Sequence, residues 1–150
     1  MFIERVRLML ISTKGRYALR VMLMLAEKED GEYLQLDAIA RAEDISEKYL
    51  ESIARLLVRA HLIEGLRGRG GGYRLTRKVS EYSVGEILRL TEGSLAPISC
   101  PCLGGADGPC SRAGDCKTLP MWKKLDSMIE NYLSGVTLAD LQEQVPKEKD

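Results

Sequence analysis

The chain has 150 residues, enough for one domain or for a small domain with an appendage. Apolar residues make up 45% of the sequence and charged residues 29%, a balance that excludes an intrinsically disordered chain and indicates a globular protein. Acids and bases cancel to a formal net charge of zero, so the total charge neither favours nor excludes a polyanionic partner.

The sequence has no membrane or export signal. No apolar run approaches the roughly 18 residues of a membrane span. Residues 1–8 mix charged with apolar side chains, unlike the apolar core of a secretory signal. We therefore expect a cytoplasmic protein without a membrane partner, and in that reducing compartment cysteines favour metal binding or redox sensing over structural disulfides.

Three helices are expected first. Apolar residues recur at helical spacing between Lys14 and Glu29, after a possible N-cap at Ser12 or Thr13. A short second helix is expected over residues 36–42, followed by a tight turn at 41–44. Ser46 then caps a third helix that runs to Ala60.

A glycine-rich basic hairpin follows the three helices. Residues 62–66 and 73–76 have the pattern of short strands, and residues 67–72 form a flexible tip with two arginines. Between Ser46 and Lys78 there are eight basic and three acidic residues, which suggests a polyanion partner. The alternative is an ordinary exposed turn beside a solvated face. Coupled to the helix pair upstream, the hairpin predicts a winged helix-turn-helix DNA-binding domain over residues 9–80.

The second half of the chain is expected to connect and dimerise. Residues 81–99 form a connecting helix, with a capping box between Ser83 and Glu86, and a loop. Residues 117–144 form a long helix and a short last helix that begins at Thr137, and residues 145–150 form a flexible tail. The long helix carries a wide apolar stripe, which favours a subunit interface over packing within one chain. The interface residues expected from this stripe are Trp122, Leu125, Met128, Ile129, Tyr132 and Leu133. The fold class is thus mainly α with a small β-hairpin.

Residues 100–116 contain all four cysteines of the chain, Cys100, Cys102, Cys110 and Cys116. Glycines and prolines surround them, so the segment can fold back and direct several thiolates at one point. Soft thiolate sulfur selects zinc, copper(I) or iron–sulfur clusters. The segment therefore predicts a metal-binding loop.

Several motifs together resemble the IscR/NsrR/CymR family of bacterial winged-helix regulators. They are Ser12-Thr-Lys-Gly-Arg-Tyr-Ala-Leu-Arg20, Ile45-Ser-Glu-Lys-Tyr-Leu-Glu51, Arg67-Gly-Arg-Gly-Gly-Gly-Tyr73 and the region Leu119–Leu141. The resemblance covers the chain from Met9 onward and implies a homodimer that binds a palindromic operator in double-stranded DNA. Because the family begins close to its Ser-Thr-Lys motif, residues 1–8 are expected to be an extension or an upstream start.

The resemblance implies roles at the DNA. Lys48 and Glu51 would face the bases in the major groove, and Arg67 would enter the minor groove. Glu51 has an alternative, as an exposed helix acid paired with Arg55. Lys14, Arg16, Arg55 and Arg59 are expected at phosphates. The full set expected at the DNA is Lys14, Arg16, Ser46, Lys48, Tyr49, Glu51, Arg55, Arg59, Arg67, Gly68 and Arg69.

The resemblance also implies an iron–sulfur sensor, with Cys100, Cys110 and Cys116 as the three family ligands. Relatives take a fourth ligand from a histidine, where this chain has Leu119, or from an acid, where it has Arg16. Cys102 is then the natural fourth ligand, although it can also be a bystander. Four thiolates suit a 2Fe-2S cluster, which we favour, or a 4Fe-4S cluster. Zinc and a metal-free thiol–disulfide switch remain alternatives.

An enzyme is not expected. With His61 as its single histidine, the chain has no serine or cysteine triad, and it has no phosphate-loop or dinucleotide motif. The sequence predicts a homodimeric transcription regulator whose operator binding is modulated by an iron–sulfur cluster. The alternatives are a cysteine-metabolism or thiol-redox repressor of the same fold without a cluster, and a zinc-binding regulator.

Overall fold

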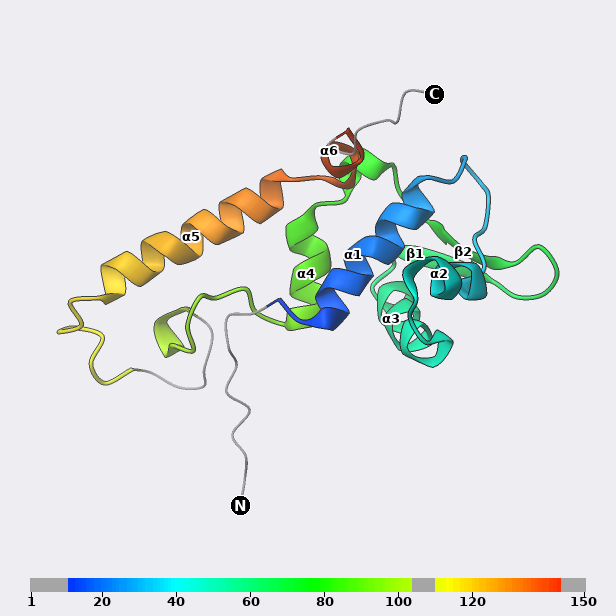
Figure 1. Cartoon of the computed structure of the whole chain (residues 1–150). Helices are drawn as coiled ribbons and strands as arrows, with labels where there is room; N and C mark the ends of the chain where they lie inside the picture. The colour runs from blue at the N-terminus through cyan, green and yellow to red at the C-terminus, as the bar shows by residue number, and fades with distance from the viewer. Residues whose placement is uncertain (1–10, 104–109, 144–150) are drawn as a thin grey trace, which may run out of the picture.

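The computed structural model describes residues 11–103 and 110–143, so the predicted extension (1–8) and tail (145–150) lie outside the described residues. The α-helices and strands in these ranges are α1 (Thr13–Ala26), α2 (Leu36–Glu43), α3 (Glu47–Arg59), β1 (Ile63–Leu66), β2 (Gly72–Leu75), α4 (Val84–Glu92), α5 (Leu119–Gly135) and α6 (Leu138–Glu143). There are also two 3-10 turns in these ranges. Val79–Glu81 precedes α4, and Pro101–Leu103 lies in the cysteine region. The mainly helical fold with one antiparallel hairpin confirms the predicted fold class (Figure 1).

The first three helices enclose one apolar core. The side chain of Ser12 caps α1 by accepting the N–H of Gly15 at 3.2 Å, as predicted. Helix α1 ends at Ala26 rather than Glu29, because the polar residues after Ala26 add nothing to its buried face. Its buried residues meet those of α3, including Leu50, Ile53 and Leu57, which are fully buried. Each such side chain stabilises the fold by about 1.5–3 kcal/mol.

The turn between α2 and α3 is tight. Asp44 adopts a left-handed conformation at φ 52°, and the N–H of Ile45 donates to the carbonyl of Ala40 at 3.0 Å. Ser46 then caps α3 by accepting the N–H of Tyr49 at 3.2 Å. A left-handed residue at the helix end followed at once by a new cap fixes the angle between the two helices.

The hairpin, here called the wing, is attached to the helices along one edge. Its strands pair from Ile63 with Leu75 to Leu66 with Gly72. Leu34 and Tyr73 exchange two backbone hydrogen bonds of 2.9 Å, which join the wing to the segment before α2. Gly72 lies at φ 134°, and a Cβ there would stand 2.4 Å from the carbonyl oxygen of Leu34. Only glycine permits this close approach.

Helix α4 packs between α1 and α5. Ser83 caps it by accepting the N–H of Glu86 at 3.1 Å. The predicted capping box is incomplete, because the Glu86 carboxylate binds Arg77 at 2.8 Å instead of the Ser83 backbone. A Cβ on Gly85 would lie 3.1 Å from the backbone nitrogen of Ser134, so α4 and α5 approach closely.

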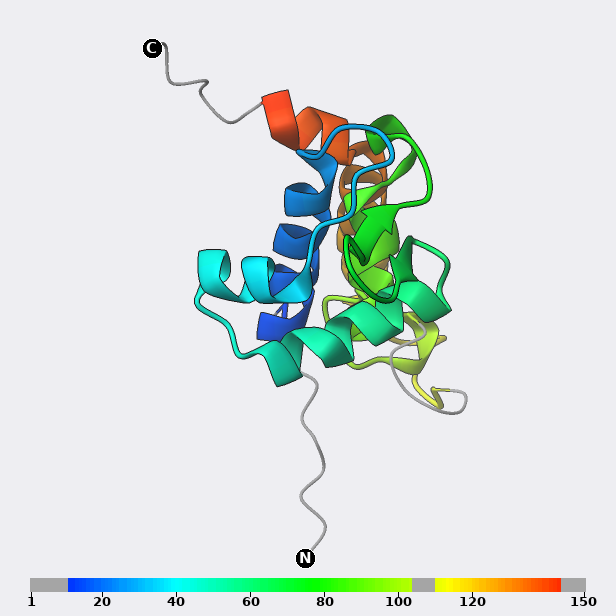
Figure 2. The ribbon, with the colours of Figure 1, turned by 90° about the vertical axis from the view of Figure 1, so that its right-hand side faces the viewer.

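Helix α5 extends away from the body of the molecule (Figure 1). Seen from the side of the wing, α2, α3 and the wing lie in front and α5 lies behind (Figure 2). A second apolar cluster of Val84, Leu88 and Leu95 holds the C-terminal half of α5 against α4. Helix α6 begins where Thr137 and Asp140 cap each other's backbone, at 2.8 and 3.1 Å, as predicted. None of the helices in the described ranges is long and apolar enough to cross a membrane.

Candidate nucleic-acid interface and cysteine loop

One side of α3 is free of the core and carries the predicted DNA contacts. Because Leu50, Ile53 and Leu57 occupy the buried face, residues between them in the helical register point outward. Lys48, Glu51, Arg55 and Arg59 are all exposed there. The ion pair considered for Glu51 and Arg55 is absent from the described part of the chain, so neither charge is neutralised by the other.

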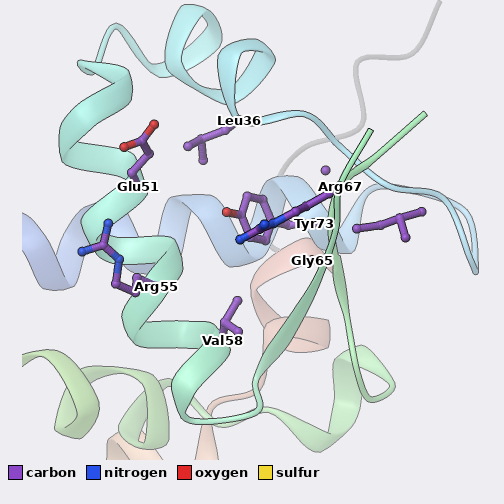
Figure 3. A pocket seen from close by; sticks show the side chains of 9 residues that line it. Leu36, Glu51, Arg55, Val58, Gly65, Arg67 and Tyr73 are labelled. Carbon is purple, nitrogen blue, oxygen red and sulfur yellow. The ribbon is translucent and has the colours of Figure 1, made fainter. Parts of the chain in front are cut away.

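A groove of about 460 Å³ separates α3 from the wing (Figure 3). Charged side chains line it from both sides, with Glu51 and Arg55 on α3 and Arg67 on the wing. Its remaining lining residues are Leu36, Val58, Gly65, Leu66, Gly72 and Tyr73. These residues were not among the predicted DNA contacts, although an apolar Val58 on the polar face of α3 indicated that this face is not simply solvated.

The arginines of the wing divide into two kinds. Arg74 pairs with Glu64 and lies over the ring of Tyr33 at 4.6 Å, and its hydrogen bond to Glu64 raises its pKa. Arg77 binds Glu86, which raises its pKa in the same way. Arg67 and Arg69 at the tip are exposed and have no ion pair among the described residues. Together with Gly68 they are therefore the part of the wing available to a polyanion.

The N-terminal turn of α1 brings two further basic residues. Arg16 is exposed, and its guanidinium donates to the Thr13 hydroxyl at 3.4 Å, whereas Lys14 is half-buried. The turn is fixed from the end of α4, because Ser12 donates to the Glu92 carboxylate from its N–H at 3.1 Å and from its hydroxyl at 2.6 Å.

Two of the predicted DNA-binding residues, Ser46 and Tyr49, make contacts within the chain that stabilise the fold. Ser46 is exposed and its hydroxyl oxygen caps α3. Tyr49 is half-buried, and its ring packs edge-on against Tyr17, with 5.9 Å between the ring centroids. The ring of Tyr49 thus holds α3 against α1, while the more exposed Lys48 beside it remains free to meet a ligand.

The four cysteines lie in the segment between α4 and α5, here called the cysteine loop (residues 100–116). All four thiols are free and half-buried. Burial raises the pKa of Cys102, and the neighbouring thiols of Cys100 and Cys110 raise it further, against the opposing effect of Lys123. Cys100 and Cys110 are thus close enough to Cys102 to act on its thiol.

Cys116 lies just before α5, and none of the other three thiols is among the causes of its pKa shift. Its sulfur is 3.4 Å from the Thr118 hydroxyl, whose hydrogen bond lowers the pKa of Cys116, as do the backbone N–H groups of Thr118 and Leu119. Among the described residues, no three His, Cys, Asp or Glu side chains converge in a metal-binding arrangement. The structure therefore brings the sulfur donors into one loop without assembling them around one point.

The apolar stripe of α5 is divided between its own chain and solvent. Ile129 and Leu133, which were expected in the interface, already pack against the cluster of Val84, Leu88 and Leu95. Trp122 and Leu125 are half-buried. Met121, Met128 and Tyr132 are 55%, 56% and 70% exposed, so the open apolar surface is narrower than the sequence predicted and includes Met121.

Comparisons with known proteins agree with this arrangement. Residues 11–144 match the family described as Rrf2, iron-dependent transcriptional regulator. The HTH-type transcriptional regulator IscR of Vibrio atlanticus is 35% identical over 133 residues, which cover 89% of this chain and 75% of that protein.

Two solved structures share the fold over almost the whole chain. CymR, the global cysteine regulator of B. subtilis, is 31% identical with a TM-score of 0.69, over 89% of this chain and 96% of that one. IscR of T. potens is 30% identical with a TM-score of 0.71, over 94% and 93% of the two chains. These likenesses confirm the predicted winged helix-turn-helix fold.

Proposed function

The chain belongs to the Rrf2 family of DNA-binding transcription regulators and is not an enzyme, and we propose that it is a homodimer whose binding to a palindromic operator is modulated by the cysteine loop. One observation carries this proposal: the cysteine loop lies between α4, which packs on α1 of the winged-helix domain, and α5, which carries the exposed apolar face. The loop thus stands between the surface that would meet DNA and the surface that would meet a second subunit.

The DNA contacts proposed lie on the outer side of α3, at the wing tip and in the first turn of α1. The N-terminal half of α3 would enter the major groove, with Lys48 and Glu51 toward the bases, because that groove carries the full donor and acceptor pattern. Arg67 at the wing tip would enter the adjacent minor groove, whose negative potential suits a planar guanidinium. Arg55 and Arg59, together with Arg16 and Lys14 on α1, would contact phosphates.

A homodimer is supported by the exposed side chains of α5. Met121, Met128 and Tyr132 are large apolar residues on a helix that leaves the body of the chain, and burying them would recover the hydrophobic free energy lost by their exposure. A two-fold axis along α5 would present two copies of α3 to two half-sites, as a palindromic operator requires.

The cysteine loop fits an iron–sulfur cluster by the chemistry of its donors. Cys100, Cys110 and Cys116 would be ligands, with Cys102 as the fourth, and four thiolates suit a 2Fe-2S cluster, which we favour, or a 4Fe-4S cluster. A bound cluster supplies a redox-active iron centre that can respond to iron supply or oxidants. Because no three of these thiols converge among the described residues, and Cys116 shares a hydrogen bond with Thr118, the loop would have to rearrange to bring all four sulfurs together.

Rearrangement of the loop would act on DNA binding through α4. This helix is held to α5 by the close approach of Gly85 to Ser134, and to α1 by the bonds from Ser12 to Glu92. A change in the loop that shifts α5 against α4 would alter the spacing of the two winged domains in the dimer. Operator affinity depends on that spacing, because both recognition helices must reach their half-sites together.

The experiment that tests the cofactor is an ultraviolet–visible spectrum of protein purified without oxygen, with iron and sulfide assays on the same sample. A cluster would give absorption between roughly 320 and 460 nm together with stoichiometric sulfide. A colourless protein that resists reconstitution with iron and sulfide would instead support zinc or a metal-free thiol switch, and zinc analysis would separate those two.

A second candidate is a regulator of cysteine metabolism that holds no cluster. The likeness to B. subtilis CymR favours it, because that structure aligns with 89% of this chain. Such a protein would bind its operator with the same affinity whether or not iron and sulfide have been removed. A cluster-dependent regulator would change its operator affinity when iron and sulfide are removed. In the triple variant Cys100/Cys110/Cys116→Ala that change should be absent.

A further inference from the structure

The hydroxyl of Tyr82 closes the root of the wing, at the end opposite its tip. Tyr82 is fully buried, and its hydroxyl donates to the carbonyl of Leu62 at 2.7 Å. The same oxygen accepts the backbone N–H groups of Thr76 and Arg77, both at 2.9 Å. A phenol has one proton to donate and two lone pairs, so these three bonds use its whole capacity.

The partners of Tyr82 flank the wing on both strands. The last residue pair at the root is Ile63 with Leu75, so Leu62 directly precedes β1 while Thr76 and Arg77 directly follow β2. The phenol therefore joins the two chain segments at the point where the ladder of backbone hydrogen bonds ends. The Thr76 hydroxyl adds a bond of 2.8 Å to the carbonyl of His61.

The backbone around Tyr82 is bound to the segment that joins α5 to α6. The N–H of Leu138, at the start of α6, donates to the Tyr82 carbonyl at 3.1 Å, and the N–H of Val84 donates to the carbonyl of Val136 at 2.8 Å. Ser83 and Thr137 form an antiparallel bridge between these bonds, and Leu138 is fully buried. One residue thus holds the wing by its side chain and the exit of α5 by its backbone.

We infer that Tyr82 is a positioning residue for DNA binding: its hydroxyl sets the direction of the wing relative to α5, and thereby the place where Arg67 meets the operator. This inference rests on the proposed function, in which Arg67 contacts DNA and α5 forms the dimer. A strand of four residues spans about 13 Å, so a tilt of about 10° at the root displaces the tip by about 2 Å.

The Tyr82→Phe variant removes the hydroxyl and keeps the buried ring. A double-mutant cycle with Arg67→Ala tests the inference, because only coupled residues give non-additive losses. The ligand is a DNA duplex enriched by the wild-type protein from a randomised pool, and its affinity is measured by fluorescence anisotropy. Each single variant is expected to weaken binding about tenfold. In the Tyr82→Phe background, Arg67→Ala should cost about twofold or less, because a displaced tip no longer makes the contact.

The control cycle pairs Tyr82→Phe with Lys48→Ala. Lys48 lies on α3, so its loss should add fully to that of Tyr82→Phe. A general loss of folded protein would give the same pattern in both cycles, whereas a positioning role makes only the Arg67 cycle non-additive. Tyr33→Phe is the matched substitution, because the Tyr33 hydroxyl has no hydrogen bond among the described residues. It should leave affinity within about twofold.

Additive losses in the Arg67 cycle, or unchanged affinity of Tyr82→Phe, would overturn the inference. If Tyr82→Phe does not fold, the milder Thr76→Ala replaces it, since it removes the root bond to His61 while Tyr82 stays in place. The same non-additivity with Arg67→Ala is then expected, and its absence would count against the inference. Failure of the proposed function would show separately, as an affinity that neither Arg67→Ala nor Lys48→Ala changes.

Discussion

The winged-helix domain and the cysteine loop obey different physical rules. In the domain, a continuous apolar core holds every helix, and the described chain has no buried side-chain nitrogen or oxygen without a hydrogen-bond partner. In the loop, the described residues form one 3-10 turn, and the four thiols are half-buried without a common centre. The domain therefore has a closed core, whereas the described part of the loop leaves its four sulfur donors without a common centre.

This difference explains how one chain can combine a fixed reader with a responsive element. A surface that reads DNA needs side chains held in constant geometry, which the core supplies. An element that senses needs two arrangements of similar free energy, which a loop without a core can have. Under the proposed function the two are joined through α4, whose close contacts with α1 and α5 would carry a displacement from one to the other.

The sharpest test of the comparison is removal of the thiols. The triple variant Cys100/Cys110/Cys116→Ala should lose all bound iron and sulfide, because no three thiolates remain. Its free energy of unfolding in urea should stay within about 0.5 kcal/mol of the cluster-free wild type, since these side chains lie outside the core. A much larger loss of stability would mean that the loop is part of the folded core.

Dimerisation should depend on the exposed apolar side chains of α5 and not on the winged-helix domain. Tyr132→Asp and Met128→Asp place a charge where burial is proposed, and we expect each to weaken dimerisation about 30-fold or more. Analytical ultracentrifugation measures the change. Ser127→Asp adds the same charge to the same helix outside the apolar set, and it should leave the dimer intact. Equal effects of all three variants would argue against this face.

Two neighbouring residues of α3 separate core from surface. Leu57 is fully buried, so Leu57→Ala should lower the free energy of unfolding by about 2–5 kcal/mol. Val58 is 36% exposed and lines the groove, so Val58→Ala should change stability by about 0.5 kcal/mol or less. Denaturation in urea with both variants measures the contrast. Similar losses would show that the groove face of α3 is packed in solution.

A phosphate contact should act evenly on all DNA sequences. Arg55→Ala is expected to weaken binding to specific and random duplexes alike, and to reduce the slope of log affinity against log salt by about 1. Titrations at several salt concentrations measure this slope. Arg41→Ala serves as control, because Arg41 lies on α2 and pairs with Asp37. A loss confined to the specific duplex would instead assign Arg55 to base recognition.

The smallest expected effect is the pH dependence of the α6 cap. The Thr137 backbone N–H and hydroxyl bind the Asp140 carboxylate and lower its pKa below the ordinary value of 3.8. A lowered pKa in the folded state stabilises the fold above the unfolded pKa, and the contribution disappears as the pH falls through the folded pKa. Wild type should thus be slightly more stable than Asp140→Asn at pH 7, and the difference should vanish in acid. Thermal unfolding across this range measures it.

The sequence by itself determined the elements and their order. Local signals fixed them: Ser12, Ser46 and Ser83 cap helices by accepting an N–H three residues later, and the glycines of the wing tip permit its turn. Such interactions lie within a few residues of each other, so spacing along the chain is enough to predict them. The clustering of the cysteines is likewise a property of the sequence.

Only the tertiary structure decided how the charges and apolar faces are used. Spacing suggested an ion pair between Glu51 and Arg55 and a capping box between Ser83 and Glu86. In the folded chain that ion pair does not form, and the Glu86 carboxylate binds Arg77 instead of completing the capping box. Spacing also could not show that Ile129 and Leu133 pack on α4, or that Tyr82 joins the wing to the start of α6. Each of these contacts joins segments distant in the chain, and a side chain with several possible partners binds the one that folding brings within reach.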